Sequence, residues 1–411
     1  MPPVTPEAAT AFSLLNAQAV RTRAHHLLGR GLKDELPHFR IDLSRLDATA
    51  DLVLAVIRQA YPSLDVPFHS RWRHFVRHGQ DRWAVLDKQA HWQDKAACAR
   101  AAFDLAIVSV FLDAGAGPQW HYRDASGEAI GRSEGLALAS LDMFAAGIFS
   151  STPREPLRAD ALERLDTAAV TRGFQVTEGN PLVGVEGRAD LLRRLGATVA
   201  ASPKIFGLND APRPGGLFDH LVGLTKEGRI EAATILAELL RHLGPIWPSR
   251  LTLAGIPLGD CWRHPAMKTA DATDQLVPLH KLSQWLAYSL IEPLQAYGIA
   301  VTSIDGLTGL AEYRNGGLFV DSGVLSLRDP AAASREHDVA STLVVEWRAL
   351  TVALLDEIAA RLRDRLHMDA QSLPLAKVLE GGTWATGRAL AKERRPDASP
   401  PIRVKSDGTV F

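Results

Sequence analysis

The sequence predicts a mainly α-helical fold that includes one small β-hairpin. Apolar residues recur at helical spacing in stretches bounded by Pro, Gly or short polar segments. The clearest strand signal is "EYRNGGLFVDSGVL" (312–325), where Asn315-Gly316 is typical of a tight turn and "LFV" of a short strand after it. The chain has 411 residues, of which 46% are apolar, so it can bury a large core.

In chain order, the expected helices cover residues 12–29, 45–60, 92–113, 132–147, 157–171, 187–201, 229–242, 276–292, 338–365 and 384–394. Pro153 and Pro156 prevent a helix from continuing through "SSTPREPLRAD" (150–160), which makes this stretch the best candidate for a boundary. The chain therefore forms either one large helical domain over residues 1–411, or an N-terminal lobe over 1–150 and a C-terminal lobe over 160–411. In the second case the C-terminal lobe carries the main catalytic segments.

The composition restricts the possible partners. Lys plus Arg (46) and Asp plus Glu (47) nearly cancel, so no overall field attracts nucleic acid or an anionic membrane. The longest apolar run, "LAIVSVFL" (105–112), is too short to span a bilayer, and the N-terminus lacks the regions of a signal peptide. The only cysteines, Cys98 and Cys261, exclude a disulfide framework. We expect a cytoplasmic protein that binds a small molecule, with its oligomeric state left open.

The segment "VPFHSRWRHFVRHG" (66–79) concentrates basic and aromatic side chains in a region that begins as a loop. His69, Arg71 and Arg73 could grip a phosphate or carboxylate through charge-assisted hydrogen bonds, with Trp72 as an apolar wall. An equally good interpretation is a surface loop whose arginines pair with nearby acids. The histidines of this segment have no recognised metal-ligand spacing, so no metal site is predicted.

The segment "PLGDCWRHP" (257–265) places a carboxylate, an aromatic ring and an imidazole between two prolines. Irregular segments of this kind often carry catalytic groups, here Asp260 and His264, with Trp262 beside them. The alternative is that Asp260 caps a short helix beginning at Cys261. The residues alone favour neither interpretation.

The expected helix 338–365 carries a carboxylate on its apolar face. Glu346 shares that face with Leu343 and Leu350, so it points toward the core. Burial raises the pKa of a carboxylate, which suits general acid or base catalysis near neutral pH. The alternative is a buried ion pair between Glu346 and an arginine.

The expected helix 276–292, "LVPLHKLSQWLAYSLIE", has an unusual polar side. Its leucines share one face, whereas the other face offers an imidazole, an amine, an amide and an indole at its edge, from His280, Lys281, Gln284 and Trp285. A merely solvated face would favour interchangeable Glu, Lys and Arg. From the residues alone, a solvated surface and a wall of the substrate site are equally good interpretations of this face, and the family resemblance described below favours the wall.

Two observations complete the candidate set. The expected hairpin could project the charges of Glu312, Arg314 and Asp321 over a cleft, although charges beside turns are usually solvated. The glycine-rich stretches 178–192 and 380–395 match no phosphate-loop or dinucleotide fingerprint, and no serine-hydrolase elbow or zinc-protease motif occurs. No cofactor is therefore predicted.

Several long segments together resemble one protein family. They are "PFHSRWRHF", "RSEGLA", "GNPLVGVEGR", "GDCWRH", "LHKLSQWLAYSLIEP", "EYRNGGLFVDSGVL", "VVEWRALTVALLDE" and the terminal "SDGTVF". The family has an uncharacterised domain and acts in a uracil-catabolism pathway that opens the pyrimidine ring at the nucleotide or nucleoside level. The resemblance covers essentially the whole chain. It implies an N-glycosidase that splits ribosylurea, or its 5′-phosphate, and releases urea.

A local resemblance to the queuosine-salvage N-glycosidases implies a helical core like that of DNA glycosylases. Asp260-Cys261-Trp262 followed by "LHKLSQ" is similar to that family's paired segments, with Asp260 at the catalytic aspartate and Gln284 at a glutamine. Leu279 departs from the family's second aspartate, and His280 and Lys281 replace a tyrosine and an arginine. These departures put the transfer of substrate contacts in doubt.

Chemistry and resemblance together assign expected roles. Cleavage of an N-ribosidic bond builds positive charge at C1′, which Asp260 would stabilise, while Glu346 or His264 serves as acid or base. The remaining candidates are Lys281, Arg71, Arg73 and Arg314 for a 5′-phosphate, Gln284 and Asp321 for urea or ribose hydroxyls, and Trp262, Trp285 and Phe68 as walls. Two alternatives stay open: an amidohydrolase or lyase acting on the ureido group, and a non-catalytic subunit that binds a pathway intermediate.

Overall fold

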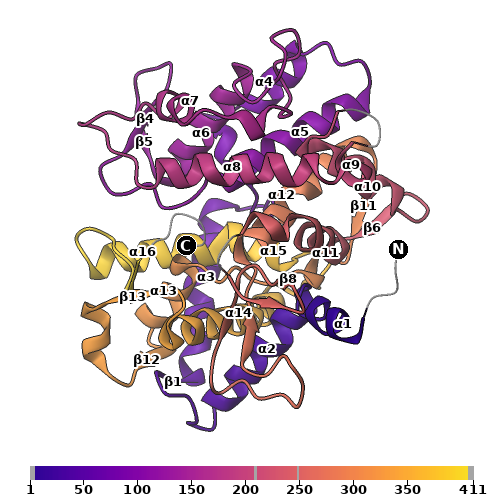
Figure 1. Cartoon of the computed structure of the whole chain (residues 1–411). Coiled ribbons are helices and arrows are strands. Elements are labelled where there is room, and N and C mark those ends of the chain that lie inside the picture. Colours follow the sequence, from indigo (N-terminus) through magenta and orange to yellow (C-terminus); the bar gives the residue numbers. More distant parts are fainter. Residues whose placement is uncertain (1–4, 208–210, 248–249, 406–411) are drawn as a thin grey trace.

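Helices form most of the computed structural model, which describes residues 5–207, 211–247 and 250–405 (Figure 1). The string "SDGTVF" (406–411) lies outside the described residues. In chain order the helices are α1 (Pro6–Phe12), α2 (Ala17–Gly31), α3 (Leu46–Ala60), α4 (Arg82–Gln89), α5 (Lys95–Phe111), α6 (Arg132–Ala145), α7 (Thr167–Gly173), α8 (Val185–Ala200), α9 (Pro203–Phe206), α10 (Leu217–Gly223), α11 (Ala232–Leu243), α12 (Lys281–Tyr297), α13 (Tyr313–Asp321), α14 (Thr342–Leu366), α15 (Leu375–Val378) and α16 (Trp384–Arg394). A mainly helical fold is confirmed.

The strands are short and pair in twos. The antiparallel pairs are β1 (Phe39–Ile41) with β12 (Leu325–Leu327), β2 (Val76–Arg77) with β3 (Gln80–Asp81), β4 (His121–Arg123) with β5 (Ala129–Gly131), β7 (Thr252–Leu253) with β8 (Ile256–Pro257), and β9 (Cys261–Arg263) with β10 (Leu276–Pro278). The parallel pairs are β6 (Arg229–Glu231) with β11 (Ala300–Thr302), and β13 (Glu336–Asp338) with β14 (Arg403–Lys405). These pairs fix loops to the helical frame.

Three helices lie at the centre of the core. Helix α5 is apolar on all sides, and nearly every residue from Ala99 to Phe111 is buried, as expected of a helix with no solvent-facing stripe. It packs against α12, and α14 packs against α2, α3 and α13. The buried apolar side chains form one continuous cluster that runs from Ala11 to Ile402. Residues that are distant in sequence are thereby held around the beginning of α12.

The predicted hairpin at 312–325 is wrong. Residues Tyr313–Asp321 form α13, and both carboxylate oxygens of Glu312 cap this helix by accepting from the amides of Arg314 and Asn315. A Cβ at Gly316 would lie 2.7 Å from the Trp347 ring, so the glycine allows close helix packing rather than a turn. Only Leu325–Leu327 pairs as a strand, with β1.

Several expected helices begin or end at residues other than those predicted; for example, residues 229–231 of the expected helix 229–242 form β6. Of the expected helix 157–171, only the part from Thr167 onward is α-helical, as α7, whereas Leu162–Arg164 form a short 3₁₀ helix before it. The expected helix 276–292 begins at Lys281, since residues 276–278 form β10 and His280 adopts a left-handed conformation with φ of 48°. That conformation is rare for a residue other than glycine and sets the angle at which the chain enters α12.

The arrangement in Figure 1 bears on the question of lobes. Helices α4 to α8 gather at one end of the molecule, and α2, α3, α13 and α14 gather at the other. Helices α6 and α7, on either side of residues 150–160, pack against each other. The division at 150–160 stays a prediction. Within the described parts of the chain, no helix combines the length and the apolar character needed to span a lipid bilayer.

Candidate active site

The beginning of α12 is built around Asp260. Its backbone carbonyl accepts from the amides of Leu279 and His280, at 2.9 and 3.1 Å. Its carboxylate accepts from the Lys281 amide at 2.9 Å, from the Trp262 indole at 2.6 Å, and from both Nη atoms of Arg348 at 2.9 and 2.7 Å. Residues 261–263 form β9, so the predicted cap of a short helix at Cys261 is wrong, and Asp260 caps α12 instead.

These contacts keep Asp260 ionised. Burial alone would raise its pKa, but the charge and hydrogen bonds of Arg348 outweigh burial and hold the pKa of Asp260 well below its usual range. A carboxylate with four fixed donors has one orientation and does not act as a proton donor near neutral pH. Asp260 can therefore act only as a permanent negative charge.

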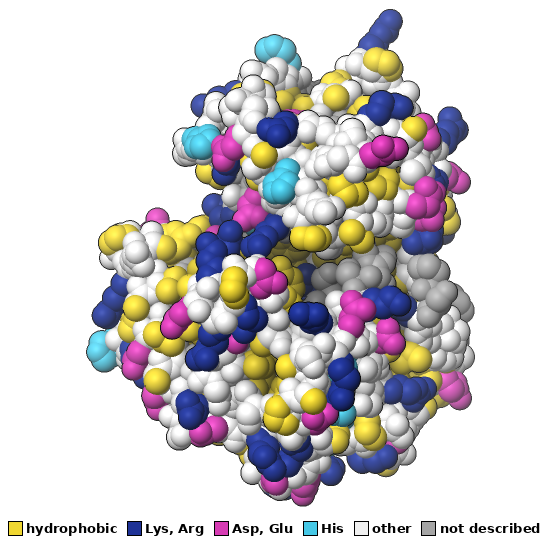
Figure 2. Space-filling model, turned by 90° about the vertical axis from the view of Figure 1, so that its left-hand side faces the viewer, with side chains coloured by type: hydrophobic (Ala, Val, Ile, Leu, Met, Phe, Trp, Pro, Cys, Tyr) yellow, Lys and Arg dark blue, Asp and Glu magenta, His cyan; other side chains and the backbone are white. Residues whose placement is uncertain are grey.

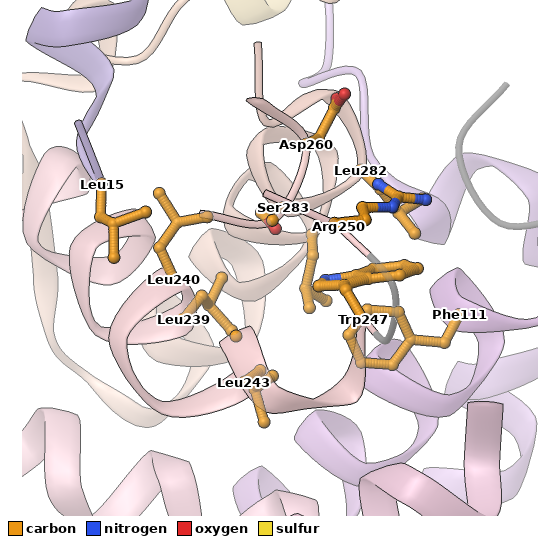
Figure 3. Close-up of a pocket in the computed structure, with 13 residues that line it drawn as sticks. Leu15, Phe111, Leu239, Leu240, Leu243, Trp247, Arg250, Asp260, Leu282 and Ser283 are labelled. Carbon is orange, nitrogen blue, oxygen red and sulfur yellow. The ribbon is translucent and has the colours of Figure 1, made fainter. Parts of the chain in front are cut away.

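Asp260 lines a pocket with an apolar floor (Figure 3). Leu282, Ser283 and Leu286 of α12 form one side, and Leu239, Leu240 and Leu243 of α11 another. Arg250 lies between Asp260 and Trp247 in Figure 3, with its guanidinium 4.9 Å from the Trp247 ring. The arrangement offers one anion, one cation and an aromatic wall to a small polar ligand.

Arg348 also bonds to the backbone beside a second buried carboxyl group, that of Glu312. Its Nε donates to the carbonyl of Ala311 at 3.2 Å, and the next residue along the chain is Glu312. Burial raises the pKa of Glu312, although the amides of Arg314 and Asn315 oppose that effect. Burial lowers the pKa of Lys281, and the negative charges of Glu312 and Asp260 oppose that effect. Asp260, Lys281, Glu312 and Arg348 therefore form one electrostatic unit, here called the Lys281 site.

The middle of the segment 66–79 packs against α12, whereas its end is exposed. The Arg71 amide donates to Ser289 Oγ at 2.9 Å, and the Trp72 indole donates to the Ser289 carbonyl at 2.7 Å. Arg73 pairs with Glu292 of the same helix. The interpretation as a loop with surface ion pairs therefore holds for Arg73, whereas Arg71 is fully buried.

Within this segment, Arg71 and His69 lie beside Trp285. The Arg71 guanidinium is 5.5 Å from the Trp285 ring, and the His69 ring is 6.3 Å from it. His69 also pairs with Glu380 at 2.7 Å. Phe68, the residue before His69, is partly buried and packs against the hydrophobic core. The structure thus brings Arg71, His69 and Trp285 together around the side of α12 that carries Lys281.

Glu346 and His264 are fully buried against each other. His264 Nε2 lies 3.0 Å from Glu346 Oε2, and Glu346 Oε1 accepts from the amides of His38 and Phe39 at 3.1 and 2.8 Å. The partner of Glu346 is therefore a histidine rather than the arginine of the alternative interpretation. Neither residue lines the pocket that Asp260 lines. The pair joins β9, β1 and α14.

Other candidates have interior partners. Gln284 exchanges hydrogen bonds with Thr308, and His280 Nε2 donates to the Leu14 carbonyl at 2.9 Å. Arg314 donates to the carbonyl of Ala398, and Asp321 is held by both Nη atoms of Arg395 at 2.8 and 2.6 Å. The predicted wall on α12 is thus divided: Lys281 and Trp285 face the polar interior of the site, whereas His280 and Gln284 anchor the helix.

Sequence reasoning missed three members of the site. Glu312 was recognised only as a charge beside a turn, and Arg348 and Asp113 were not singled out. Arg348 follows Glu346 by two positions, so the two side chains point to different sides of the helix. A second polar side on this otherwise apolar helix is the feature that could have indicated Arg348. Asp113 had no such signal, because its role depends on Arg71, which lies 3.4 Å away.

A separate cluster of titratable groups lies on α10 and α11. His220 and His242 place their Nε2 atoms 2.7 and 3.1 Å from Glu238 Oε2, and Arg241 pairs with the other oxygen at 3.0 Å. The possible ligand atoms of His220, Glu238 and His242 lie within 4.8 Å of one another. The cluster joins the two helices behind the pocket wall that α11 forms.

Comparison with known proteins gives whole-chain matches. Residues 13–411 match a family described as a protein of unknown function (DUF1688). The chain is 41% identical to Protein urg3 of Schizosaccharomyces pombe over 415 residues, covering 98% of this chain and 99% of that protein. It is 36% identical to Uracil catabolism protein 4 of Lachancea kluyveri over 411 residues, covering 91% and 92% of the two chains.

Proposed function

The chain belongs to this family of proteins of unknown function, and we propose that it is an enzyme of uracil catabolism that hydrolyses the N-ribosidic bond of a ring-opened uracil nucleoside or nucleotide and releases urea. Similarity along nearly the whole chain to Uracil catabolism protein 4 supports the pathway. The observation that supports the reaction is the Lys281 site, where an ionised Asp260 lines a pocket and is held by Arg348, whose Nε donates to the carbonyl of Ala311, the residue before the buried Glu312.

Hydrolysis breaks the bond between C1′ and the urea nitrogen and joins a water oxygen to C1′. As the bond stretches, positive charge develops at C1′ and on the ring oxygen. Asp260 is suited to stabilise that charge because it stays ionised and is one of the residues that line the pocket. Arg348 compensates part of its charge in the resting protein and fixes the direction in which its oxygens point.

The departing nitrogen needs a proton. Glu312 is suited to supply it, because burial raises its pKa and keeps its carboxyl group protonated at a higher pH than an ordinary glutamate. The resulting carboxylate can then accept the proton that the attacking water loses. Each turnover thus consumes one water and restores Glu312.

Glu346 and His264 have a different role in this proposal. Both are fully buried and bonded to each other. Glu346 also accepts from the backbone amides of Phe39, the first residue of β1, and of His38, the residue before it. We assign them the positioning of β9, and hence of Asp260, against α14. Contact with the substrate is assigned to groups at the pocket and around Lys281, with Trp262 and Trp285 excluding water.

The test is incubation of the purified full-length protein with ribosylurea and, separately, with its 5′-phosphate. Formation of urea together with free ribose or ribose 5-phosphate is the expected result. Formation of ammonia or carbamate with an intact ribosyl bond would show chemistry at the ureido group instead. Tight binding of either compound without any product would indicate a binding subunit and would overturn the proposal.

A further inference from the structure

The Trp285 indole is surrounded by basic side chains. Arg71 and Lys281 place their charged ends 5.5 and 6.0 Å from the ring, and the His69 and His74 rings lie at 6.3 and 5.8 Å. Burial, together with the neighbouring charge of Arg71, lowers the pKa of His74 to about 4, so this histidine is neutral at neutral pH. Arg71 and Lys281 are then the fixed positive charges at the ring.

Several donors in this group have no acceptor. The Trp285 side chain is 4% exposed, and in the described part of the chain its Nε1 has no hydrogen-bond partner. The same holds for Nη2 of Arg71, a residue with 0% exposure. Among the described residues, the Lys281 ammonium makes no hydrogen bond or ion pair, although its side chain is half-buried. Unpaired buried donors cost free energy, so their concentration around one ring points to a ligand with several acceptor oxygens.

The acidic groups that face Arg71, His69 and His74 are already engaged, among them Glu134, which pairs with Arg388 at 3.6 Å. Asp113 accepts from Ser133 Oγ at 2.6 and 2.5 Å and lies 3.4 Å from Nη1 of Arg71. Glu312 accepts from two backbone amides, and Glu380 accepts from His69. None of these carboxylates takes the donors of Trp285 Nε1, Arg71 Nη2 or Lys281 Nζ. The three donors remain available to an anion.

We infer that Arg71, Lys281 and Trp285 form a phosphate-binding subsite and that the substrate carries a phosphate on its ribose. A guanidinium, an ammonium and an indole N–H can each donate to a different oxygen of a tetrahedral anion. The identity of the rest of the ligand rests on the proposed function, whereas the inference that the ligand carries a phosphate rests on the donors that have no acceptor. Figure 2 shows the molecule hollowed between its two ends, with Lys or Arg and also Asp or Glu side chains beside the hollow.

The test measures phosphate binding without turnover. Inorganic phosphate, ribose 5-phosphate and acetate are titrated calorimetrically into the full-length protein. The two phosphates should bind, and acetate should bind far more weakly. Absence of phosphate binding, or equal binding of acetate, would overturn the subsite even if ribosylurea is split. Phosphate binding without any urea release would instead leave the subsite standing and remove the proposed function.

Variants locate the binding. Trp285→Phe removes the indole N–H but keeps an aromatic ring, and Lys281→Met removes the ammonium. Arg71→Lys keeps the positive charge of this buried side chain but removes the guanidinium. Each should weaken phosphate binding by about tenfold or more, since one charge-assisted hydrogen bond is lost. The matched controls are Trp92→Phe, whose indole N–H is bonded to Asp87, and Lys268→Met, whose side chain is 58% exposed. Equal binding by all five variants would refute the assignment.

Discussion

Arg348 holds both oxygens of Asp260, with Nη1 to Oδ1 at 2.9 Å and Nη2 to Oδ2 at 2.7 Å. Both side chains are almost completely withdrawn from solvent. Such a pair is costly to break from one side, because the remaining charge stays buried without a partner. The pair therefore links the stability of the fold to the orientation of the proposed catalytic carboxylate.

A double-mutant cycle should reveal this coupling. Asp260→Asn and Arg348→Met should each lower the free energy of unfolding by about 3–5 kcal/mol, because each leaves one buried charge unpaired. The double variant should lose clearly less than the sum, since it buries no lone charge. Urea denaturation with matched m-values measures all four proteins. Strict additivity would mean that the two side chains do not stabilise each other.

Asp260→Asn should also separate catalysis from binding. The amide keeps the size of the carboxylate but removes the negative charge that would stabilise positive charge at C1′. We expect urea release to slow by about 10²-fold or more, while ribose 5-phosphate still binds. The control is Asp274→Asn, a carboxylate in the loop between β9 and β10 whose side chain is 35% exposed. Unchanged turnover in Asp260→Asn would exclude its proposed role.

Glu312 should determine the alkaline limit of activity. Because burial raises its pKa, its protonated form persists above the usual range of a glutamate, and general-acid catalysis should decline as pH rises through that raised value. Glu312→Gln cannot donate a carboxylic proton, so it should lose most of the activity and this alkaline decline together. The measurement is the pH profile of kcat for urea release. An unchanged profile in Glu312→Gln would assign the proton donor to another group.

Glu346 tests whether a buried acid is structural or catalytic. Glu346→Gln keeps the side-chain shape but weakens the acceptor for two backbone amides and His264, so the protein should lose about 1–3 kcal/mol of stability. The folded molecules of this variant should release urea with nearly the kcat of the wild-type protein. Thermal unfolding and kcat per folded molecule are measured together. A large fall in kcat at unchanged Tm would instead support the direct acid or base role expected from the sequence.

The helical fold was predictable because apolar periodicity is a local signal. Helices α3, α6 and α16 begin within one residue of their expected positions, since the apolar periodicity of each lies within its own segment. The hairpin prediction failed at Asn315-Gly316 for a physical reason. The same glycine serves a turn or a close helix contact, and only the position of Trp347, far away in sequence, decides between them.

The site was predictable only in part. Asp260, Lys281, Trp285 and Arg71 were found because their residue types are unusual in their local context. The partner of Glu346, by contrast, depends on how β9 crosses α14, which no local pattern encodes. Arg348 and Glu312 acquire their roles from contacts between segments many residues apart, such as Arg348 Nε with the Ala311 carbonyl. Unusual residue types can be recognised from the local sequence, whereas the partners of those residues cannot.

The cluster around Glu238 should control stability in acid. Burial opposes ionisation of Glu238, but hydrogen bonds from His220 and His242 and the charge of Arg241 hold its folded-state pKa well below the ordinary value of 4.5. A carboxylate with a depressed folded pKa contributes stability that is fully present above its unfolded pKa and is lost as pH falls toward the folded value. The wild-type protein should therefore lose stability as pH falls below about 4.5, and Glu238→Gln should lose less over that interval. Unfolding free energies measured by urea denaturation between neutral pH and acid check this, with Glu35→Gln, a more exposed glutamate, as the control. Parallel pH dependence in wild type and Glu238→Gln would show that the cluster does not stabilise the fold through this carboxylate.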